Sequence, residues 1–272
     1  MRKAPTHKAA TNAEHWLVLA AWPPELAHLR ASLPDLPARL RRRVTLASVG
    51  VGMVEAGIAA ARLIDEHQPS AVLLVGTAGV YPGQRPELAL GGAAIARSIR
   101  LLPQILPGKH AFLPTMIPTE ARSTPALVRV LRKGTGLPCA DVACPLGITA
   151  TAKAATTAAA LSGCALENLE AFAVARAAAV AKVPFAAILG IANHVGPSGH
   201  REWEKHAKAA AESACRAVVE GLSSLSANYG AHETSQPAGS KPAAAARPKR
   251  TSIDWRTSGA IVRVSSLAYM PR

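Results

Sequence analysis

The chain has 272 residues, of which 49% are hydrophobic, 18% are charged and 4% are aromatic. This composition can bury a core made mostly of Ala, Val, Leu and Ile, and it excludes disorder of the whole chain. The formal net charge of +14 favours an anionic partner, although part of this charge lies beyond residue 230.

The first part of the chain alternates between predicted strands and helices. Residues 1–14 are polar and aperiodic, so we expect a flexible N-terminus. Short apolar runs predict buried strands at residues 16–21, 44–49, 71–75 and near 93–99. Helical spacing predicts helices at residues 24–33 and 53–66. The prolines within residues 101–120 predict an irregular segment.

The second part continues this alternation. We predict helices at residues 125–133, 152–182 (interrupted at Ser162-Gly163) and 201–226, and strands at 146–151 and 184–192. Short apolar strands between helices indicate an α/β fold with a central, mostly parallel or mixed sheet flanked by helices. We expect one domain over residues 15–228. Residues 229–272, rich in Ala, Ser, Pro and Lys near their start, are expected to form a basic, largely disordered C-terminal tail.

The sequence predicts neither disulfides nor a membrane segment. Four cysteines are too few for a disulfide framework in a chain of this length, so we expect reduced thiols. The longest uncharged stretch, residues 68–84, contains Pro and Gly residues that are atypical of a membrane-spanning helix. The apolar run at 16–22 is short for a signal peptide. We therefore expect a cytoplasmic protein.

Cofactor and metal motifs are weak in this chain. Gly50-x-Gly52 follows a strand and precedes a helix, but Glu55 replaces the third glycine of a dinucleotide fingerprint. His194 and His200 have no third ligand at a metal spacing, and they read best as surface or loop histidines. The arginines within residues 39–43 are typical of a solvated helix end or loop, and the alternative is that they contact nucleic acid or an anionic substrate. We predict no cofactor and no metal, and nucleic-acid binding is not favoured.

Three polar residues follow or end predicted buried strands. Glu25 lies just past the first strand, Glu170 opens an Ala-rich helix, and Asn193 ends the last strand. Strand ends meet at one edge of a parallel sheet, where a carboxylate can bind sugar hydroxyls or activate water. The alternative is that Glu167 and Glu170 only favour the start of a helix electrostatically. The pattern alone leaves both interpretations open.

Taken in order, several segments resemble the nucleoside phosphorylase/nucleosidase superfamily, and futalosine hydrolases in particular. The segments are LVLAAWPPEL (17–26), SVGVGMVEA (48–56), LLVGTAGV (73–80), LENLEAFAVA (166–175) and VPFAAILGIANHVGPSGHREW (183–203). The most specific are Glu-Asn-Leu-Glu before an Ala-rich helix and Ala-Asn-His-Val-Gly before a Trp. The aromatic residue that such proteins normally place after residue 147 is missing from GITATAKAATT (147–157).

The resemblance implies roles for individual residues. Glu25 would activate the attacking water, and Glu170 would hold the ribose hydroxyls. Thr77 would touch the ribose or its water, Leu169 would lie under the sugar, and Asn193 would face the five-membered ring of a purine. The other positions that match the substrate cleft are Gly52, Ala78, Gly79, Thr149 and Asn168.

The resemblance also implies a reaction, the hydrolysis of the N-glycosidic bond of a purine nucleoside. An Asn amide suits a 6-oxopurine, so the expected substrate is futalosine-like and the released base is hypoxanthine, as in menaquinone biosynthesis. Leu189-Gly190 stands where phosphorolytic relatives carry an Arg, which favours hydrolysis. A phosphorolytic or non-catalytic nucleoside-binding protein is the alternative. The family implies a homo-oligomer.

Overall fold

The computed structural model describes residues 15–84, 86–103 and 114–233. The N-terminus expected to be flexible and most of the expected basic tail lie outside these ranges. The expected tail begins at residue 229, but the last helix extends to Glu233. Among the described helices, none is both long enough and apolar enough to cross a membrane. None of the four cysteines is joined in a disulfide, in agreement with the expected reduced thiols.

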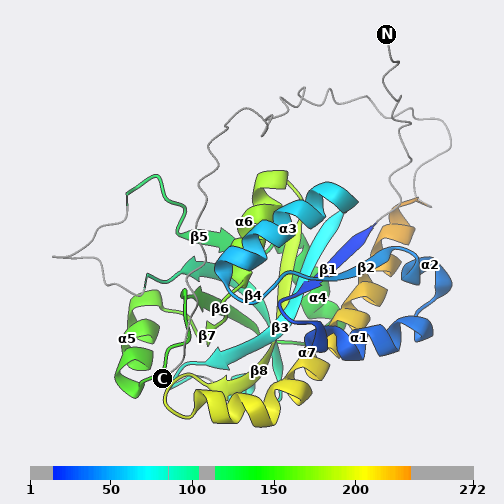
Figure 1. Ribbon diagram of the computed structural model, residues 1–272. Helices are drawn as coiled ribbons and strands as arrows, with labels where there is room; N and C mark the ends of the chain where they lie inside the picture. Colours follow the sequence, from blue (N-terminus) through cyan, green and yellow to red (C-terminus); the bar gives the residue numbers. More distant parts are fainter. Residues whose placement is uncertain (1–14, 85, 104–113, 234–272) are drawn as a thin grey trace, which may run out of the picture. The chain divides into compact units, whose positions relative to one another are not determined.

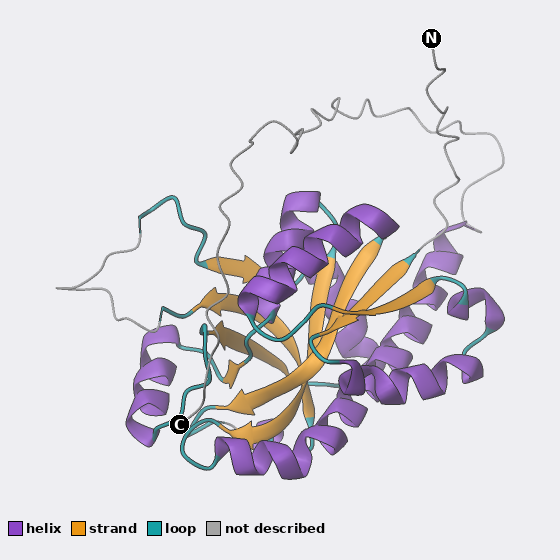
Figure 2. Ribbon diagram, in the orientation of Figure 1, coloured by secondary structure: helices purple, strands orange, loops and turns teal. Residues whose placement is uncertain are grey.

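Eight strands form one mixed sheet (Figures 1 and 2). They are β1 (Trp16–Ala20), β2 (Val44–Ser48), β3 (Ala71–Val80), β4 (Ala93–Leu101), β5 (Glu120–Arg122), β6 (Cys139–Cys144), β7 (Leu166–Glu167) and β8 (Phe185–His194). β1 lies between β2 and β3 with both pairs parallel, while β4 pairs with β5 in the antiparallel direction. β3 pairs with both β7 and β8, and these are linked through β6 and β4, so five strands close into a ring.

Helices cover both faces of this sheet, as an α/β fold requires. They are α1 (Ala27–Ser32), α2 (Ala38–Arg41), α3 (Met53–His67), α4 (Pro125–Thr135), α5 (Ala152–Ser162), α6 (Ala171–Ala181) and α7 (Gly199–Glu233), with 3₁₀ turns at Pro23–Leu26, Leu33–Asp35 and Pro86–Leu88. In Figure 1, α3 and α6 lie together on one side of the sheet, whereas α1, α4 and α7 lie on the other.

The first strand shows how the apolar pattern divides the core between these two faces. Leu17 and Leu19 belong to the cluster that includes α3 and α6, while Trp16, Val18 and Ala20 belong to the cluster with α1, α4 and α7. Alternate side chains of a strand point to opposite faces, so a strand covered on both sides is apolar throughout. The expected fold class, an α/β domain with a mixed sheet flanked by helices, is confirmed.

Two expectations about elements were wrong, and one was incomplete. No strand forms at 146–151, because Pro145 and Gly147 interrupt the chain there; β6 instead spans Cys139–Cys144. The Ala-rich segment 152–182 is interrupted at Ser162-Gly163 as expected, but the short strand β7 between its two helices was not predicted. β3 does not end at residue 75 but runs to Val80, with an irregularity at Ala78/Gly79, so the glycine-rich segment is part of the sheet.

One close approach fixes α7 against the sheet. A Cβ atom at Gly190 would collide with the main-chain carbonyl of Ala210, so only glycine lets the helix pass β8 at this point. The contact places the first turns of α7 beside the ends of β3 and β8. The residues after β1 reach the same edge of the sheet, and this edge carries the site.

Candidate active site

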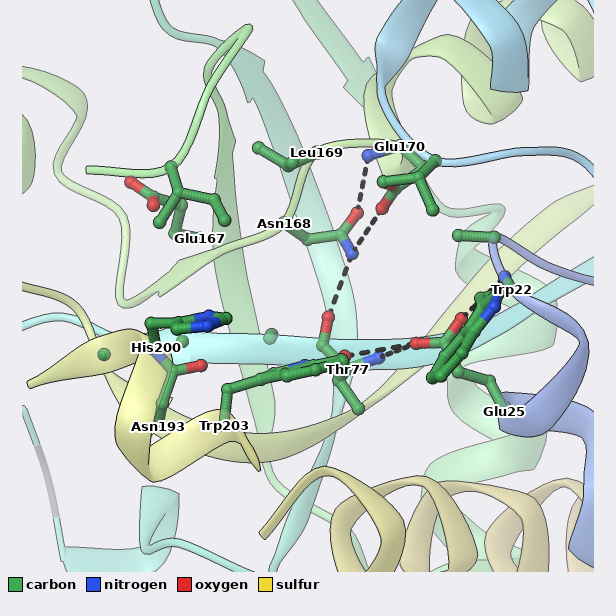
Figure 3. Close-up of a pocket in the computed structure, with 16 residues that line it drawn as sticks. Trp22, Glu25, Thr77, Glu167, Asn168, Leu169, Glu170, Asn193, His200 and Trp203 are labelled. Carbon is green, nitrogen blue, oxygen red and sulfur yellow. Dashed lines mark hydrogen bonds between the residues drawn. The ribbon is translucent and has the colours of Figure 1, made fainter. Parts of the chain in front are cut away.

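A cavity of about 400 Å³ opens at this edge of the sheet (Figure 3). Segments that are far apart in sequence contribute to its wall: the turn after β1, the end of β3, the β7–α6 turn, the end of β8 and the start of α7. The lining residues are Ala21, Trp22, Glu25, Val51, Thr77, Ala78, Gly79, Ile148, Glu167, Asn168, Leu169, Glu170, Asn193, Gly199, His200 and Trp203. Eight of the ten predicted site residues are among them.

Glu25 is buried, with 8% exposure, and its carboxylate accepts hydrogen bonds from three donors. The 3₁₀ turn Pro23–Leu26 follows β1 and presents the carboxylate to β3. Its Oε1 accepts the Thr77 main-chain N–H at 3.0 Å and the Thr77 hydroxyl at 3.1 Å, and its Oε2 accepts the Trp22 N–H at 3.1 Å. Burial raises the pKa of Glu25, while these hydrogen bonds act in the opposite direction.

Glu170 is the second buried carboxylate of the cavity, with 5% exposure. Its Oε1 accepts the Gly52 N–H at 2.8 Å, and its Oε2 accepts the Asn168 amide at 3.1 Å. Burial raises the pKa of Glu170, and the charge of Glu25 raises it further, against the hydrogen bond from Gly52. The effect of the Glu25 charge on Glu170 indicates that the two carboxylates face the same cavity at close range.

Asn168 holds the β7–α6 turn together through all parts of its amide. Its Oδ1 accepts the N–H groups of Glu170 and Ala171 at 3.0 and 2.8 Å, which satisfies donors at the start of α6. Its Nδ2 donates to the Thr77 carbonyl at 3.0 Å and to Glu170. This predicted binding residue therefore ties the turn that carries Glu170 to Thr77 of β3, which in turn binds Glu25.

Gly52 and Thr149 are the two predicted site residues that lie behind the cavity wall. Gly52 has φ 89°, a left-handed conformation that favours glycine, and it turns its N–H toward Glu170. Thr149 donates its N–H and its hydroxyl to Glu167, whose carboxylate also accepts the Tyr81 hydroxyl at 2.7 Å. Both residues act on carboxylates of the wall.

Asn193 lies on the opposite side of the cavity from Glu25 (Figure 3). Its Nδ2 donates to the His194 carbonyl at 2.9 Å, which leaves one N–H and the amide oxygen for a ligand. Glu202 anchors the following loop by accepting the N–H of His194 and the hydroxyl of Ser198. Although burial raises it, these hydrogen bonds lower the pKa of Glu202 to about 2.

Sequence reasoning missed the aromatic side of the cavity. The segment 147–157 has no aromatic residue, but Trp22 and Trp203 line the cavity, with ring centroids 6.2 Å apart and planes inclined by 37°. Trp203 also donates its indole N–H to the Thr77 hydroxyl oxygen at 3.2 Å. Both residues lie in the segments that carry the resemblance, and this position was the available signal. His200, expected to be a surface histidine, also lines the cavity.

Leu189 and Gly190, the positions where phosphorolytic relatives carry an Arg, contribute no cation to the cavity. Leu189 is fully buried and Gly190 packs against α7, so neither presents a group to the cavity. Of the described residues that line the cavity, none is Lys or Arg. Within the described parts of the chain, no group of three or more His, Cys, Asp or Glu residues is arranged to hold a metal ion.

Comparison with known structures gives the same fold at low sequence identity. The 5′-methylthioadenosine/S-adenosylhomocysteine nucleosidase of Neisseria meningitidis, solved with methylthio-immucillin-A, is 17% identical, with a TM-score of 0.69 over 78% of this chain and 100% of that chain. The Colwellia psychrerythraea enzyme of the same name, solved with adenine, is 21% identical, with a TM-score of 0.69 over 78% and 96%. Futalosine hydrolase of Helicobacter pylori is 10% identical, with a TM-score of 0.70 over 77% and 97%.

Comparison with curated proteins found no match. The family model of the phosphorylase superfamily matches residues 17–223, which include every predicted site residue. This range covers most of the chain, and the resemblance read from the sequence is thereby confirmed. The chain belongs to the phosphorylase superfamily.

Proposed function

We propose that this protein hydrolyses the N-glycosidic bond of a purine nucleoside. The observation that carries the proposal is the pair of buried carboxylates, Glu25 and Glu170, which come from distant segments and line one cavity. Burying two carboxylates near each other costs free energy, and such costly pairs are typical of functional sites. The names of the structurally similar nucleosidases and of futalosine hydrolase support the same reaction class.

Glu25 serves as the general base. It takes a proton from water while the water oxygen bonds to C1′ of the ribose, and the C1′–N9 bond breaks. The electron pair of that bond passes to the purine, which takes up a proton from solvent as it leaves, and Glu25 afterwards returns the proton of the water to solvent. A base works best when its pKa lies near the working pH, and burial moves the pKa of Glu25 in that direction. The donors from Thr77 and Trp22 keep the carboxylate oriented.

Glu170 holds the ribose hydroxyls. Gly52 and Asn168 bind its two oxygens and fix the side chain before a ligand arrives, so little reorganisation is required. Positive charge develops on the ribose as the base departs. The two carboxylates therefore stabilise the positively charged sugar of the transition state more than they stabilise the ground state.

Asn193 selects the base, and we propose a 6-oxopurine such as the hypoxanthine of futalosine. Its remaining N–H can donate to the departing ring, and its carbonyl oxygen can accept from an N–H of the base. This preference is the finer part of the proposal. The expected homo-oligomer and the cytoplasmic location also stay predictions.

Water is the nucleophile in this proposal. Phosphate would need cationic partners, and no described residue that lines the cavity is Lys or Arg. A phosphorolytic protein and a non-catalytic nucleoside-binding protein are the competing functions, and one assay separates all three.

The test is to incubate the purified protein with futalosine, inosine, methylthioadenosine or adenosylhomocysteine in phosphate-free buffer and to measure free base by chromatography. We expect base release without phosphate, and Glu25→Gln should lower the rate about 100-fold or more while binding is retained. Glu66→Gln, an exposed acid paired with Arg62 on α3, is the matched control and should keep the wild-type rate. Strict dependence on phosphate, or binding without turnover, would contradict hydrolysis.

A further inference from the structure

We propose that Trp203 is a positioning residue: its indole N–H fixes the Thr77 hydroxyl so that this hydroxyl donates to the carboxylate of Glu25. The inference rests on the function proposed above, because it assigns the residue that orients the donor to the general base. The segments that carry the resemblance include Trp203, but they assign it no role, and it is not among the predicted site residues.

The direction of each hydrogen bond follows from the chemistry of the groups. An indole N–H can only donate, so the Thr77 oxygen must be the acceptor in the 3.2 Å contact with Trp203. An ionised carboxylate can only accept, so the Thr77 hydroxyl must donate its hydrogen across the 3.1 Å contact with Glu25. The chain of donors therefore runs in one direction, from Trp203 through Thr77 to Glu25.

Without the indole N–H, the hydroxyl keeps only its own hydrogen bond to Glu25 to hold it in this orientation. A threonine hydroxyl rotates freely and is both donor and acceptor, so it can turn toward water in the cavity. Trp203 uses one of the hydroxyl's acceptor sites and leaves its hydrogen directed at Glu25. The main-chain N–H of Thr77, which also binds Glu25 at 3.0 Å, is held by β3 and does not depend on Trp203.

Trp22 provides a matched comparison on the same wall. It lies 6.2 Å from Trp203 between ring centroids and also contacts Glu25, but through its main-chain N–H. A substitution of the Trp22 side chain therefore leaves its hydrogen bond to Glu25 in place. Replacing Trp by Phe removes the same aromatic bulk at positions 22 and 203. Only at position 203 does it also remove a side-chain N–H that binds Thr77.

Trp203→Phe leaves the other titratable side chains around the cavity in the sequence. Glu170 lies across the cavity, and its pKa is raised by burial and by the charge of Glu25. Cys215 of α7 donates its thiol to the main-chain carbonyl of Glu25. His200 lines the same cavity. Because a donated hydrogen bond favours the charged carboxylate, losing the Thr77 hydroxyl must raise the pKa of Glu25.

The experiment is the pH profile of kcat/KM for Trp203→Phe, Trp22→Phe and wild type. The acid limb reports the ionisation of the base, and we expect Trp203→Phe to move it to higher pH by about half a unit or more. Trp22→Phe should leave its position unchanged. Thr77→Val should cause a similar shift, and adding Trp203→Phe to Thr77→Val should cause no further shift. Equal limbs in the two Trp variants, or an additive shift in the double variant, would overturn the proposal.

A second readout does not need turnover. The carboxyl carbon of Glu25 can be titrated by NMR in protein labelled with ¹³C-glutamate, with the signal assigned by its loss in Glu25→Gln. If no nucleoside is cleaved, the proposed function fails, while the titration still decides whether Trp203 acts on Glu25. If Trp203→Phe does not fold, 3-benzothienylalanine at position 203 keeps the bicyclic shape without the N–H. An unchanged Glu25 titration in that protein would overturn the proposal.

Discussion

Asn168→Ala tests whether one amide holds the turn that carries Glu170 against Thr77 of β3. The substitution removes four hydrogen bonds: two from N–H groups at the start of α6, one to the Thr77 carbonyl and one to the Glu170 carboxylate. A hydrogen bond contributes about 1 kcal/mol on average, and a buried partner left unpaired costs more. Four of them, in a residue that is buried, give an expected loss of about 4 kcal/mol in the free energy of unfolding.

Urea unfolding followed by tryptophan fluorescence measures this loss. With a slope of about 2 to 3 kcal/mol/M, the midpoint should fall by roughly 1.3 to 2 M. Asn193→Ala is the control, because its amide is only partly buried and makes one hydrogen bond, to the adjacent His194 carbonyl. We expect it to cost about 1 kcal/mol or less. If Asn168→Ala is no more destabilising than Asn193→Ala, Asn168 does not hold this turn.

The remaining predictions concern packing, ionisation and base choice. Gly190→Ala places a methyl group against the Ala210 carbonyl and should cost ~2 kcal/mol or more in a urea titration. Gly57→Ala meets an ordinary neighbour at 3.4 Å and serves as its control. Because burial raises the pKa of Glu25, the folded protein keeps this proton to a higher pH than the unfolded chain. The resulting stabilisation is complete below about pH 4 and is lost as the pH rises through the folded pKa. Unfolding of wild type and Glu25→Gln across this range should show wild type losing relative stability with rising pH; a constant or growing advantage would contradict it. Finally, wild type should release hypoxanthine faster than adenine, and Asn193→Asp should shift the preference toward adenine nucleosides, with activity rising at lower pH as the carboxyl protonates. An unchanged preference in chromatographic assays would refute this role.

The fold class and most of the longer elements could be predicted from local pattern. β1 and β8 are continuous apolar runs, and such runs indicate strands that are covered on both faces. The element type at 146–151 could not be read in this way, because Leu146 and Ile148 are apolar but exposed at a loop. β7 was missed because two residues carry no periodicity, and only its pairing with β3 and β6 makes it a strand.

In the candidate site too, some residues could be predicted from local pattern, whereas others depend on tertiary contacts. Glu25, Glu170 and Asn193 were found because each lies at the end of a buried strand or at the start of a helix, and the motifs that carry the resemblance include all three. The sequence could not show that Thr149 and Gly52 lie behind the wall. Their positions depend on tertiary hydrogen bonds, from Gly52 to Glu170 and from Thr149 to Glu167.

What the sequence determined by itself is the set of segments that end at one edge of the sheet and the polar groups that they carry. What the tertiary structure decided is which groups meet. Trp203 is 126 residues from Thr77, and Gly52 is 118 residues from Glu170. Hydrophobic burial that brings such segments together is not directional, whereas each hydrogen bond depends on position within a few tenths of an ångström. These partners are therefore set only when the closed ring of strands, α6 and α7 are in place.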